Sequence, residues 1–210
     1  MTTLSVKPRR GRPPKIAREN RDTRAELIRS GLEHLTEFGF SSSGIEPILK
    51  KVGVPKGSFY HYFASKEAFG ETVLAHYDGY FAGKLDMHLL DTQFTPIQRL
   101  ENFVDHAAQG MARHDFKRGC LVGNLSQEVE ALPLGFRSQL SAIFAGWQHR
   151  LETCLQEAKN TGDIASTADC AQLAEFFWIG WEGAVSRAKL MQAPQPLTLF
   201  LHYFLQALPK

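Results

Sequence analysis

The stretch VPKGSFYHYF, Val54 to Phe63, is small, basic and aromatic at once. Phe59 and Phe63 lie four residues apart, so that both rings can pack inward from one side of a helix. The other side then carries the small, basic and hydrogen-bonding residues of the stretch: Lys56, Gly57, Ser58, Tyr60 and His61. A core helix would hide its aromatic residues and would not need this combination. The stretch therefore predicts a short helix with one buried face and one face that meets a polar partner.

A helix is expected before this stretch, starting near Asp22 or Thr23. Both are good N-cap residues, and Glu26 follows Thr23 by three positions, which is the spacing of a capping box. Apolar residues then recur at helical spacing until Phe38, and Gly39 ends the helix.

A second short helix is expected between this first helix and the opening stretch. Ser43 is a candidate cap for it, and Gly53 breaks it. Pro55 suits the first turn of the third helix, where its missing N–H costs nothing. Ser65 then caps a long helix that begins at Lys66.

Two short helices joined by a tight turn predict a helix-turn-helix, whose second helix enters the major groove of DNA. In that arrangement Gly57 permits close approach to the DNA backbone, and Lys56 and Ser58 reach base edges or phosphate. Tyr60 and His61 would bond phosphate oxygens. Lys66 stands in the first turn of the next helix, where backbone N–H groups attract phosphate. The alternative is a small helical bundle with a polar face.

The charge of the chain is unevenly distributed. Residues 1–66 hold 13 basic and 6 acidic residues, a net +7, whereas residues 67–210 hold 11 and 16, a net −5. A basic front part and an acidic rear part indicate that only the front meets a polyanion.

Residues 1–20 lack apolar periodicity and are expected to form a disordered basic arm. Its RGRP core, with Arg9, Arg10 and Arg12, resembles an AT-hook. Arginines beside a small residue can lie along a narrow A·T minor groove. The alternative is a solvated tail that adds non-specific affinity.

The front domain is expected to span residues 21–66 and the rear domain residues 67–210, and the fold class is all-α. Rear helices are expected at about 66–90, 96–114, 119–131, 134–160, 168–192 and 196–207.

Three scattered cysteines form no disulfide framework or zinc spacing, so neither a metal nor a cofactor is expected. With no secretory signal and no long apolar run, we expect a cytoplasmic protein that does not insert into a membrane.

The run from Thr23 to Phe69, above all GVPKGSFYHYFASKEAF, resembles the DNA-binding domain of the TetR family of repressors. The signature residues are Gly39-Phe40 and the stretch from Gly57 to Phe63. The resemblance implies an all-helical homodimer that binds a palindromic operator and is released by a small-molecule effector. It also implies a set of DNA contacts: Ser43, Lys56, Gly57, Ser58, Tyr60, His61 and Lys66.

The rear half contains MARHDFKRGCLVGNLSQEVEALP and FFWIGWEGAVSRAKL, which resemble members of that family that respond to acrylate or to reactive electrophiles. The resemblance implies that Cys120 and Lys189 form a sensing pair, and that the effector is acrylate or a related acid or electrophile. A lysine ammonium close to Cys120 would lower the pKa of the thiol. The alternative is that Cys120 is a small buried hydrophobic residue.

The helix expected around residues 174–190 carries further candidates. Trp178, Trp181 and Glu182 either line the effector pocket or belong to the core and the dimer interface. A buried Glu182 would need a partner, such as Lys189 or Arg187. Asn124, close after Cys120, either orients a ligand or acts as a cap.

Two other classes of function have less support in the sequence. An enzyme using Cys120 lacks support, because no histidine can be placed beside it, and His106 and His114 are expected to be exposed. An architectural AT-hook protein would not need a sizeable helical rear domain. The sequence therefore favours a regulator that is not an enzyme.

Overall fold

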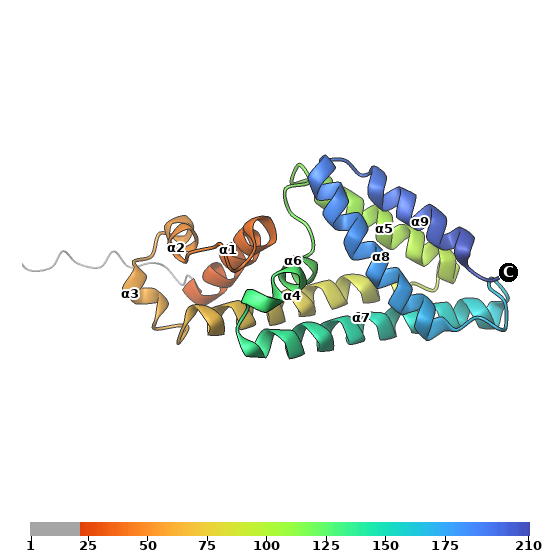
Figure 1. Ribbon diagram of the computed structural model, residues 1–210, viewed down its shortest axis with the longest axis horizontal. Coiled ribbons are helices and arrows are strands. Elements are labelled where there is room, and N and C mark those ends of the chain that lie inside the picture. Colours follow the sequence, from red (N-terminus) through yellow and green to blue (C-terminus); the bar gives the residue numbers. More distant parts are fainter. Residues whose placement is uncertain (1–21) are drawn as a thin grey trace, which may run out of the picture.

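Helix α4 (Lys66–Leu89) joins a small front domain to a larger rear domain in the computed structural model, which describes residues 22–210 (Figure 1). The described residues form helices and no strand, so the expected all-α class is confirmed. The front helices are α1 (Thr23–Phe38), α2 (Glu46–Val52) and α3 (Lys56–Phe59). The rear helices are α5 (Pro96–Ala112), α6 (Leu121–Gln127), the 3-10 turn η1 (Val129–Ala131), α7 (Leu134–Thr161), α8 (Cys170–Met191) and α9 (Gln195–Ala207).

Local sequence signals set the ends of α1 and α4. Asp22 caps α1, with its carboxylate accepting from the N–H of Ala25 at 3.1 Å. Gly39, at φ 81°, ends α1 in a conformation that side chains rarely adopt. Ser65 caps α4 and accepts from the N–H of Ala68 at 3.1 Å, as predicted.

Ser43 does not have its predicted role. The N-cap of α2 is Ile45, without a side-chain cap, and the Ser43 hydroxyl is buried and donates to the carbonyl oxygen of Gly39 at 2.6 Å. The serine therefore braces the turn after α1. Pro55 likewise occupies the N-cap of α3 rather than its first turn.

An aromatic cluster holds the front domain on the start of α4. The rings of Phe59 and Phe63 are buried as expected, and both pack edge-on against Phe69, at centroid distances of 5.3 and 4.9 Å. Burial of such side chains stabilises a fold by roughly 2 kcal/mol each. The short α3 is thus fixed from beneath, and its other face is left open.

The core of the rear domain lies where α4, α5, α7 and α8 pack together, with α9 against α8. Its largest buried side chains include Trp147, Trp178 and Phe177. The Trp178 ring packs at a tilt against Trp147 and edge-on against Phe177. The helix expected at 119–131 is two separate pieces, α6 and η1, because the chain leaves the α-helical path after Gln127.

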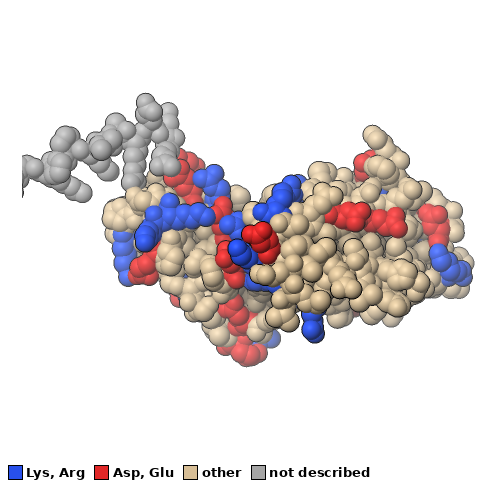
Figure 2. Space-filling view, turned by 90° about the horizontal axis from the view of Figure 1, so that it is seen from above, with Lys and Arg blue, Asp and Glu red and all other residues tan. Residues whose placement is uncertain are grey.

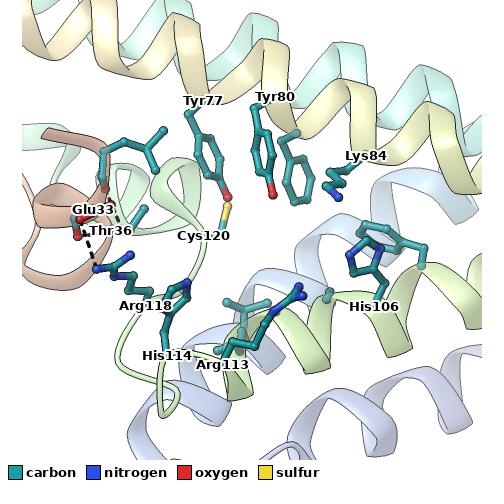
Figure 3. Close-up of a pocket in the computed structure, with 18 of the residues that line it drawn as sticks. Glu33, Thr36, Tyr77, Tyr80, Lys84, His106, Arg113, His114, Arg118 and Cys120 are labelled. Atoms are coloured by element: carbon teal, nitrogen blue, oxygen red, sulfur yellow. Dashed lines mark hydrogen bonds and ion pairs between the residues drawn. The ribbon is translucent and has the colours of Figure 1, made fainter. Parts of the chain in front are cut away.

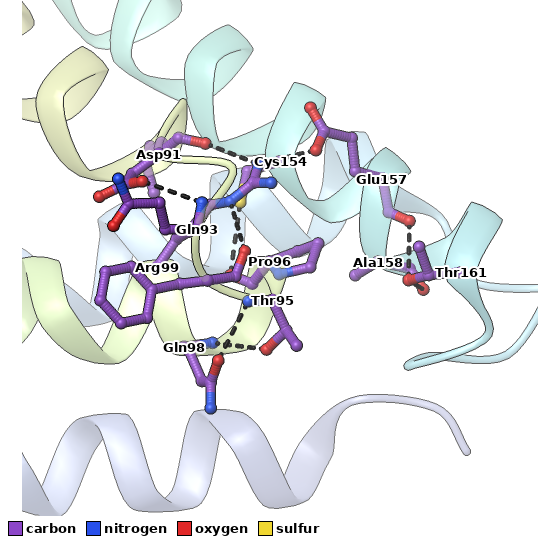
Figure 4. A network of polar contacts seen from close by, with 12 residues as sticks. Asp91, Gln93, Thr95, Pro96, Gln98, Arg99, Cys154, Glu157, Ala158 and Thr161 are labelled. Atoms are coloured by element: carbon purple, nitrogen blue, oxygen red, sulfur yellow. Dashed lines mark hydrogen bonds and ion pairs between the residues drawn. The ribbon is translucent and has the colours of Figure 1, made fainter.

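Figure 4 shows the polar network around Arg99, between the start of α5 and α7. The buried guanidinium donates to the carbonyl oxygens of Phe94 and Leu89 at 3.0 and 3.1 Å and to the carboxylate of Glu157 at 2.7 Å. The loop between α4 and α5 is thereby tied to α7, with its backbone acceptors satisfied.

The predicted arm, with Arg9, Arg10 and Arg12, lies outside the described residues. Among residues 22–210, no helix is both long and apolar enough to cross a bilayer.

Candidate DNA-binding surface and effector cavity

The outer face of α3 and the turn after it forms a compact exposed surface. Lys56, Gly57 and His61 are exposed, and the rings of Tyr60 and Tyr62 are 55% and 41% exposed. Ser58 is half-buried at the edge of this surface. On the face shown in Figure 2, basic and acidic side chains gather over the front domain and its junction with the rear, and much of the rear part of that face carries neither.

Gly57 has open space around it. A Cβ atom placed there would meet nothing within 4 Å, and its backbone φ is not in the positive range. The fold therefore does not require glycine at this position, although a partner approaching closely would.

Two predicted DNA contacts already have partners within the chain. The Lys56 ammonium pairs with the carboxylate of Glu46 at 2.9 Å, in an exposed ion pair. The Lys66 ammonium donates to the carbonyl oxygen of Phe40 at 2.9 Å and lies over the ring of Phe40. Lys66 thus ties α4 to the turn after α1, and it is less free than the sequence suggested.

A cavity of about 620 Å³ lies between α1 and the rear domain (Figure 3). Helix α1 contributes Arg29, Leu32, Glu33 and Thr36, and α4 contributes Tyr77, Tyr80, Phe81, Lys84 and His88. Helix α5 contributes Phe103, His106, Ala107, Gly110 and Met111, and the segment after it Arg113, His114, Arg118, Gly119 and Cys120. Helix α8 contributes Trp181 and Val185. An occupant of this size of cavity would touch both domains.

Cys120 stands at the inner end of the cavity as the N-cap of α6, and its Sγ accepts from the N–H of Gly123 at 3.4 Å. Burial and the nearby carboxylate of Glu182 raise the pKa of this thiol well above its usual range. The neighbouring phenol of Tyr77 also has a raised pKa, chiefly because it is buried. The resting cysteine is therefore a protonated thiol.

The Lys189 ammonium is bound away from the Cys120 thiol, and the pKa of that thiol is raised and not lowered as expected. The ammonium donates to the carbonyl oxygens of Glu37 and Thr36, at 2.8 and 3.3 Å, and burial lowers its pKa. The carbonyl groups at the end of a helix attract cations, which explains this choice of partner. Lys189 lies near Cys120 in the fold but holds α1.

Glu182 was expected to pair with Lys189 or Arg187, but it pairs with neither. Its carboxyl lies beside the Cys120 thiol, and Oε1 is buried without a hydrogen-bond partner. Burial raises the pKa of Glu182 to about 7, against a smaller opposing effect of its hydrogen bond with Cys120. Part of the residue still reaches the surface, but the carboxyl itself does not.

The two tryptophans of α8 have different roles. Trp181 is buried and lines the cavity. Trp178 packs behind it in the core against Trp147 and Phe81, and its indole Nε1 has no hydrogen-bond partner.

Comparison with known proteins identifies this arrangement. Residues 27–71 match the family model described as bacterial regulatory proteins of the tetR family, and residues 96–204 match the tetracyclin repressor-like C-terminal domain. The chain belongs to the TetR family. It is 51% identical to the transcriptional regulator AcuR of Cereibacter sphaeroides, over 96% of this chain and 92% of that one. It is 30% identical to the transcriptional repressor NemR of Escherichia coli, over 84% and 88%.

A solved structure supports the same assignment. The regulatory protein TetR from Rhodobacter sphaeroides superposes with a TM-score of 0.87 and 50% identity, covering 89% of this chain and 98% of that one. The protein is thus a TetR-family transcriptional repressor with a helix-turn-helix domain, and its relatives are regulators and not enzymes. No group of residues suited to hold a metal ion occurs in the described part of the chain.

This TetR-family chain ties its DNA-binding domain to α6. Asn124 donates from Nδ2 to the carbonyl oxygen of Thr36 at 2.9 Å, so it caps α1. The carboxylate of Glu128 accepts from the N–H groups of Phe40 and Ser41, the latter at 2.7 Å. Gly39 is needed here, because a Cβ atom would lie 2.1 Å from the Glu128 carboxylate. Cys120, which lines the cavity, is the N-cap of α6. The same short helix therefore borders the cavity and is hydrogen-bonded to the front domain through Asn124.

The sequence analysis missed most of the cavity residues, among them Lys84, His88, Tyr77 and Arg113. The first three share one face of α4 with Tyr80 and Phe81, at helical spacing that was visible in the sequence. His106 and His114 both line the cavity; His114 is exposed as expected, whereas His106 is half-buried.

Proposed function

We propose that this protein is a dimeric repressor that binds a palindromic operator and leaves it when a small acid, acrylate or a close relative, enters the cavity. The observation that carries the proposal is the cavity wall. It is built jointly by α1 of the DNA-binding domain and by the rear helices α4, α5 and α8. A ligand there has different contacts when α1 moves, which is the differential affinity that a switch requires.

The DNA contact would be made by the exposed face of α3. Lys56 and Ser58 are placed to reach bases or phosphate, and Gly57 leaves room for close approach. Tyr60 and His61 project from the turn after α3 and suit phosphate oxygens. The resemblance of Ser43 and Lys66 to family contact positions is weaker support, since both polar groups are engaged within the chain.

The dimer would form through α8 and α9. Large apolar side chains on these helices are exposed, among them Phe176, Ile179 and Tyr203, at 52%, 68% and 61%. Gly183 lies in the same stripe of α8 with nothing around its Cβ position, so that a second helix could approach closely. A second copy of the chain would bury this stripe in a four-helix interface.

An acid is favoured as the effector because the cavity wall is cationic. Arg29, Lys84, Arg113 and Arg118 line it, against one carboxylate, that of Glu33. Glu33 is itself paired with Lys51 and Arg118. A concave surface with an excess of positive charge and an aromatic floor suits a small unsaturated carboxylate.

A covalent response at Cys120 is the second candidate. The thiol would add across the activated C=C bond of an electrophile. The S–C bond would form at the β carbon, and the thiol proton would end on the α carbon. Cys120 lines the cavity, which supports access, but its raised pKa makes the resting thiol a slow nucleophile.

Fluorescence anisotropy on the protein's own upstream DNA tests the function directly. We expect tight, salt-sensitive binding that acrylate reverses. Binding that acrylate leaves unchanged would discard the acid effector, and an absence of specific binding would discard the repressor.

A pair of glycine substitutions tests the DNA-binding face. Gly57→Ala and Gly79→Ala both add a methyl group to a helix in open space, so each should leave stability unchanged or raise it by up to about 1 kcal/mol. Only Gly57→Ala should weaken operator binding. Equal operator affinity in the two variants would show that α3 does not approach DNA closely.

A charge on the apolar stripe tests the dimer. Ile179→Glu should give a monomer in sedimentation, whereas Leu134→Glu, at a side chain that is 99% exposed on α7, should not. A dimer that survives Ile179→Glu would place the interface elsewhere.

A further inference from the structure

The two ends of the effector cavity differ in chemistry. At the inner end stand the buried side chains of Cys120 and Tyr77, both protonated and in contact with each other, and the buried carboxyl of Glu182 lies behind Cys120. At the outer end stand Lys84, His106 and Arg113 (Figure 3), with His88 in contact with His106. The first set suits a neutral reactive group, and the second suits an anion.

The outer end is short of negative charge. Lys84 and Arg113 form no ion pair with any acidic residue among residues 22–210, and the Lys84 ammonium lies 5.7 Å from the centre of the Tyr80 ring. Elsewhere in the cavity Arg118 is paired with Glu33 and Glu37. Arg29, on α1, is one of the charges that lower the pKa of Glu33. Lys84 and Arg113 are therefore the lining cations that have no carboxylate partner in the cavity wall.

The two histidines at this end act as a unit. Nε2 of His88 and Nδ1 of His106 are 2.6 Å apart, so one ring donates a hydrogen bond to the other. Burial lowers the pKa of both imidazoles, and the charge of Lys84 lowers both further. That shared effect places Lys84 close to the pair, and Arg113 acts in the same way on His106.

The separation of the two ends exceeds the length of a small acid. Tyr77 and His88 lie on one face of α4, eleven residues apart, which is about 16 Å along the helix axis. Acrylate spans about 5 Å at ordinary bond lengths. The rings of Tyr80 and Phe81 line the wall between the ends. A carboxylate held at the histidine pair would leave its alkene far from Cys120.

We propose that the cavity contains two separate subsites, an anion subsite formed by Lys84, His88, His106 and Arg113 and a thiol subsite at Cys120. The anion subsite binds the carboxylate of the acid effector reversibly, without any bond to Cys120. The thiol subsite takes neutral electrophiles. This inference rests on the proposed function and names where each class of effector binds.

Isothermal titration of the full-length protein with acrylate and with acrylamide tests the anion subsite without DNA. Acrylamide has the same alkene and nearly the same size, but no charge. A charge-assisted hydrogen bond is worth about 1.5–3 kcal/mol, so acrylamide should bind at least tenfold more weakly. Equal affinity for the two compounds would overturn the proposal.

Substitutions separate the two subsites. Lys84→Met and His106→Gln should each weaken acrylate binding by about tenfold or more, whereas Lys117→Met, an exposed lysine outside the cavity wall, should not change it. Cys120→Ser should keep wild-type acrylate affinity. Loss of acrylate binding in Cys120→Ser, or unchanged binding in both Lys84→Met and His106→Gln, would overturn the proposal.

Release from the operator is measured separately with acrylate and with N-ethylmaleimide, a neutral electrophile. Cys120→Ser should abolish only the response to N-ethylmaleimide, and Lys84→Met should blunt only the response to acrylate. If acrylate binds as described but releases no DNA, the proposed function fails while the anion subsite stands. If both variants lose both responses, the division into two subsites is wrong.

Discussion

Two buried cysteines mark the two ends of the rear domain, and their surroundings differ. Cys154 lies beside Arg99, and its Sγ donates to the carbonyl oxygen of Pro96 at 3.5 Å, in a network whose backbone acceptors are satisfied. Cys120 lies beside a cavity, next to the carboxyl of Glu182, one of whose oxygens has no partner. Burial raises the pKa of both thiols, that of Cys154 to about 11.

The difference between the two cysteine sites distinguishes a structural site from a regulatory one within the same helical domain. Polar groups that are fully bonded, as around Arg99, hold loops in place. A buried polar atom that is left without a partner, as Glu182 Oε1 is, carries a cost that a purely structural site would not retain. We therefore place regulation at the Cys120 end.

The largest expected effect concerns Glu182. Its pKa of about 7 lies above that of an exposed carboxyl, so the folded protein binds this proton more tightly than the unfolded chain does. The stabilisation is fully present below about pH 4.5 and is lost as the pH rises through 7. Glu182→Gln removes the cost of ionisation and should raise the free energy of unfolding at pH 8 by about 3 kcal/mol.

Chemical denaturation at pH 5 and pH 8 measures this effect. The variant and the wild type should differ much less at pH 5 than at pH 8. A variant that is no more stable at pH 8 would show that the Glu182 carboxyl is solvated.

A smaller loss of stability is expected at the other end. Arg99→Met leaves the carbonyl oxygens of Phe94 and Leu89 without their donor and should cost about 2 kcal/mol. Arg150→Met removes a half-exposed pair with Asp86 from the same helix α7 as Glu157 and should cost under about 1 kcal/mol. Thermal unfolding of both variants compares them, and equal losses would mean that burial of the Arg99 network adds nothing.

The smallest expected effect concerns the reactivity of Cys120. Because the Glu182 carboxylate raises the pKa of this thiol, Glu182→Gln should speed its alkylation by N-ethylmaleimide at pH 8 several-fold. Lys189→Met should leave the rate unchanged, since the ammonium is engaged by the end of α1. Mass spectrometry of the Cys120 peptide over time gives both rates. A slower reaction in Lys189→Met would show that the Lys189 ammonium does activate the Cys120 thiol.

The sequence predicted the helix-turn-helix and the long rear helices because caps, glycines and apolar spacing are local signals. Phe59 and Phe63 point inward, and Ser65 caps α4, as predicted. The expected partners of Lys189 and Glu182 were wrong for a physical reason, whereas their part in sensing an effector stays a prediction. Helical spacing and the family resemblance correctly predict that both residues lie near Cys120. They do not predict that the carbonyl groups at the end of α1 bind the Lys189 ammonium.

The cationic end of the cavity was missed because its residues come from α4, α5 and the segment after α5. Taken singly in the sequence, each of these residues is predicted to be an ordinary charged or polar residue on the surface. Only the packing of α5 against α4 brings His88 to His106. Sites of this kind depend on tertiary contacts that periodicity does not contain.

The spacing of the two DNA-binding domains in the dimer tests the central claim most directly. A nitroxide attached to Lys50→Cys, an exposed site in α2, would report that spacing by pulsed electron paramagnetic resonance. Wild-type protein treated with the same label is the control for any reaction at the three buried cysteines. We predict a distance distribution that shifts when acrylate is added and does not shift in Lys84→Met at the same concentration. An unchanged distribution at saturating acrylate would contradict a switch that works by moving α1.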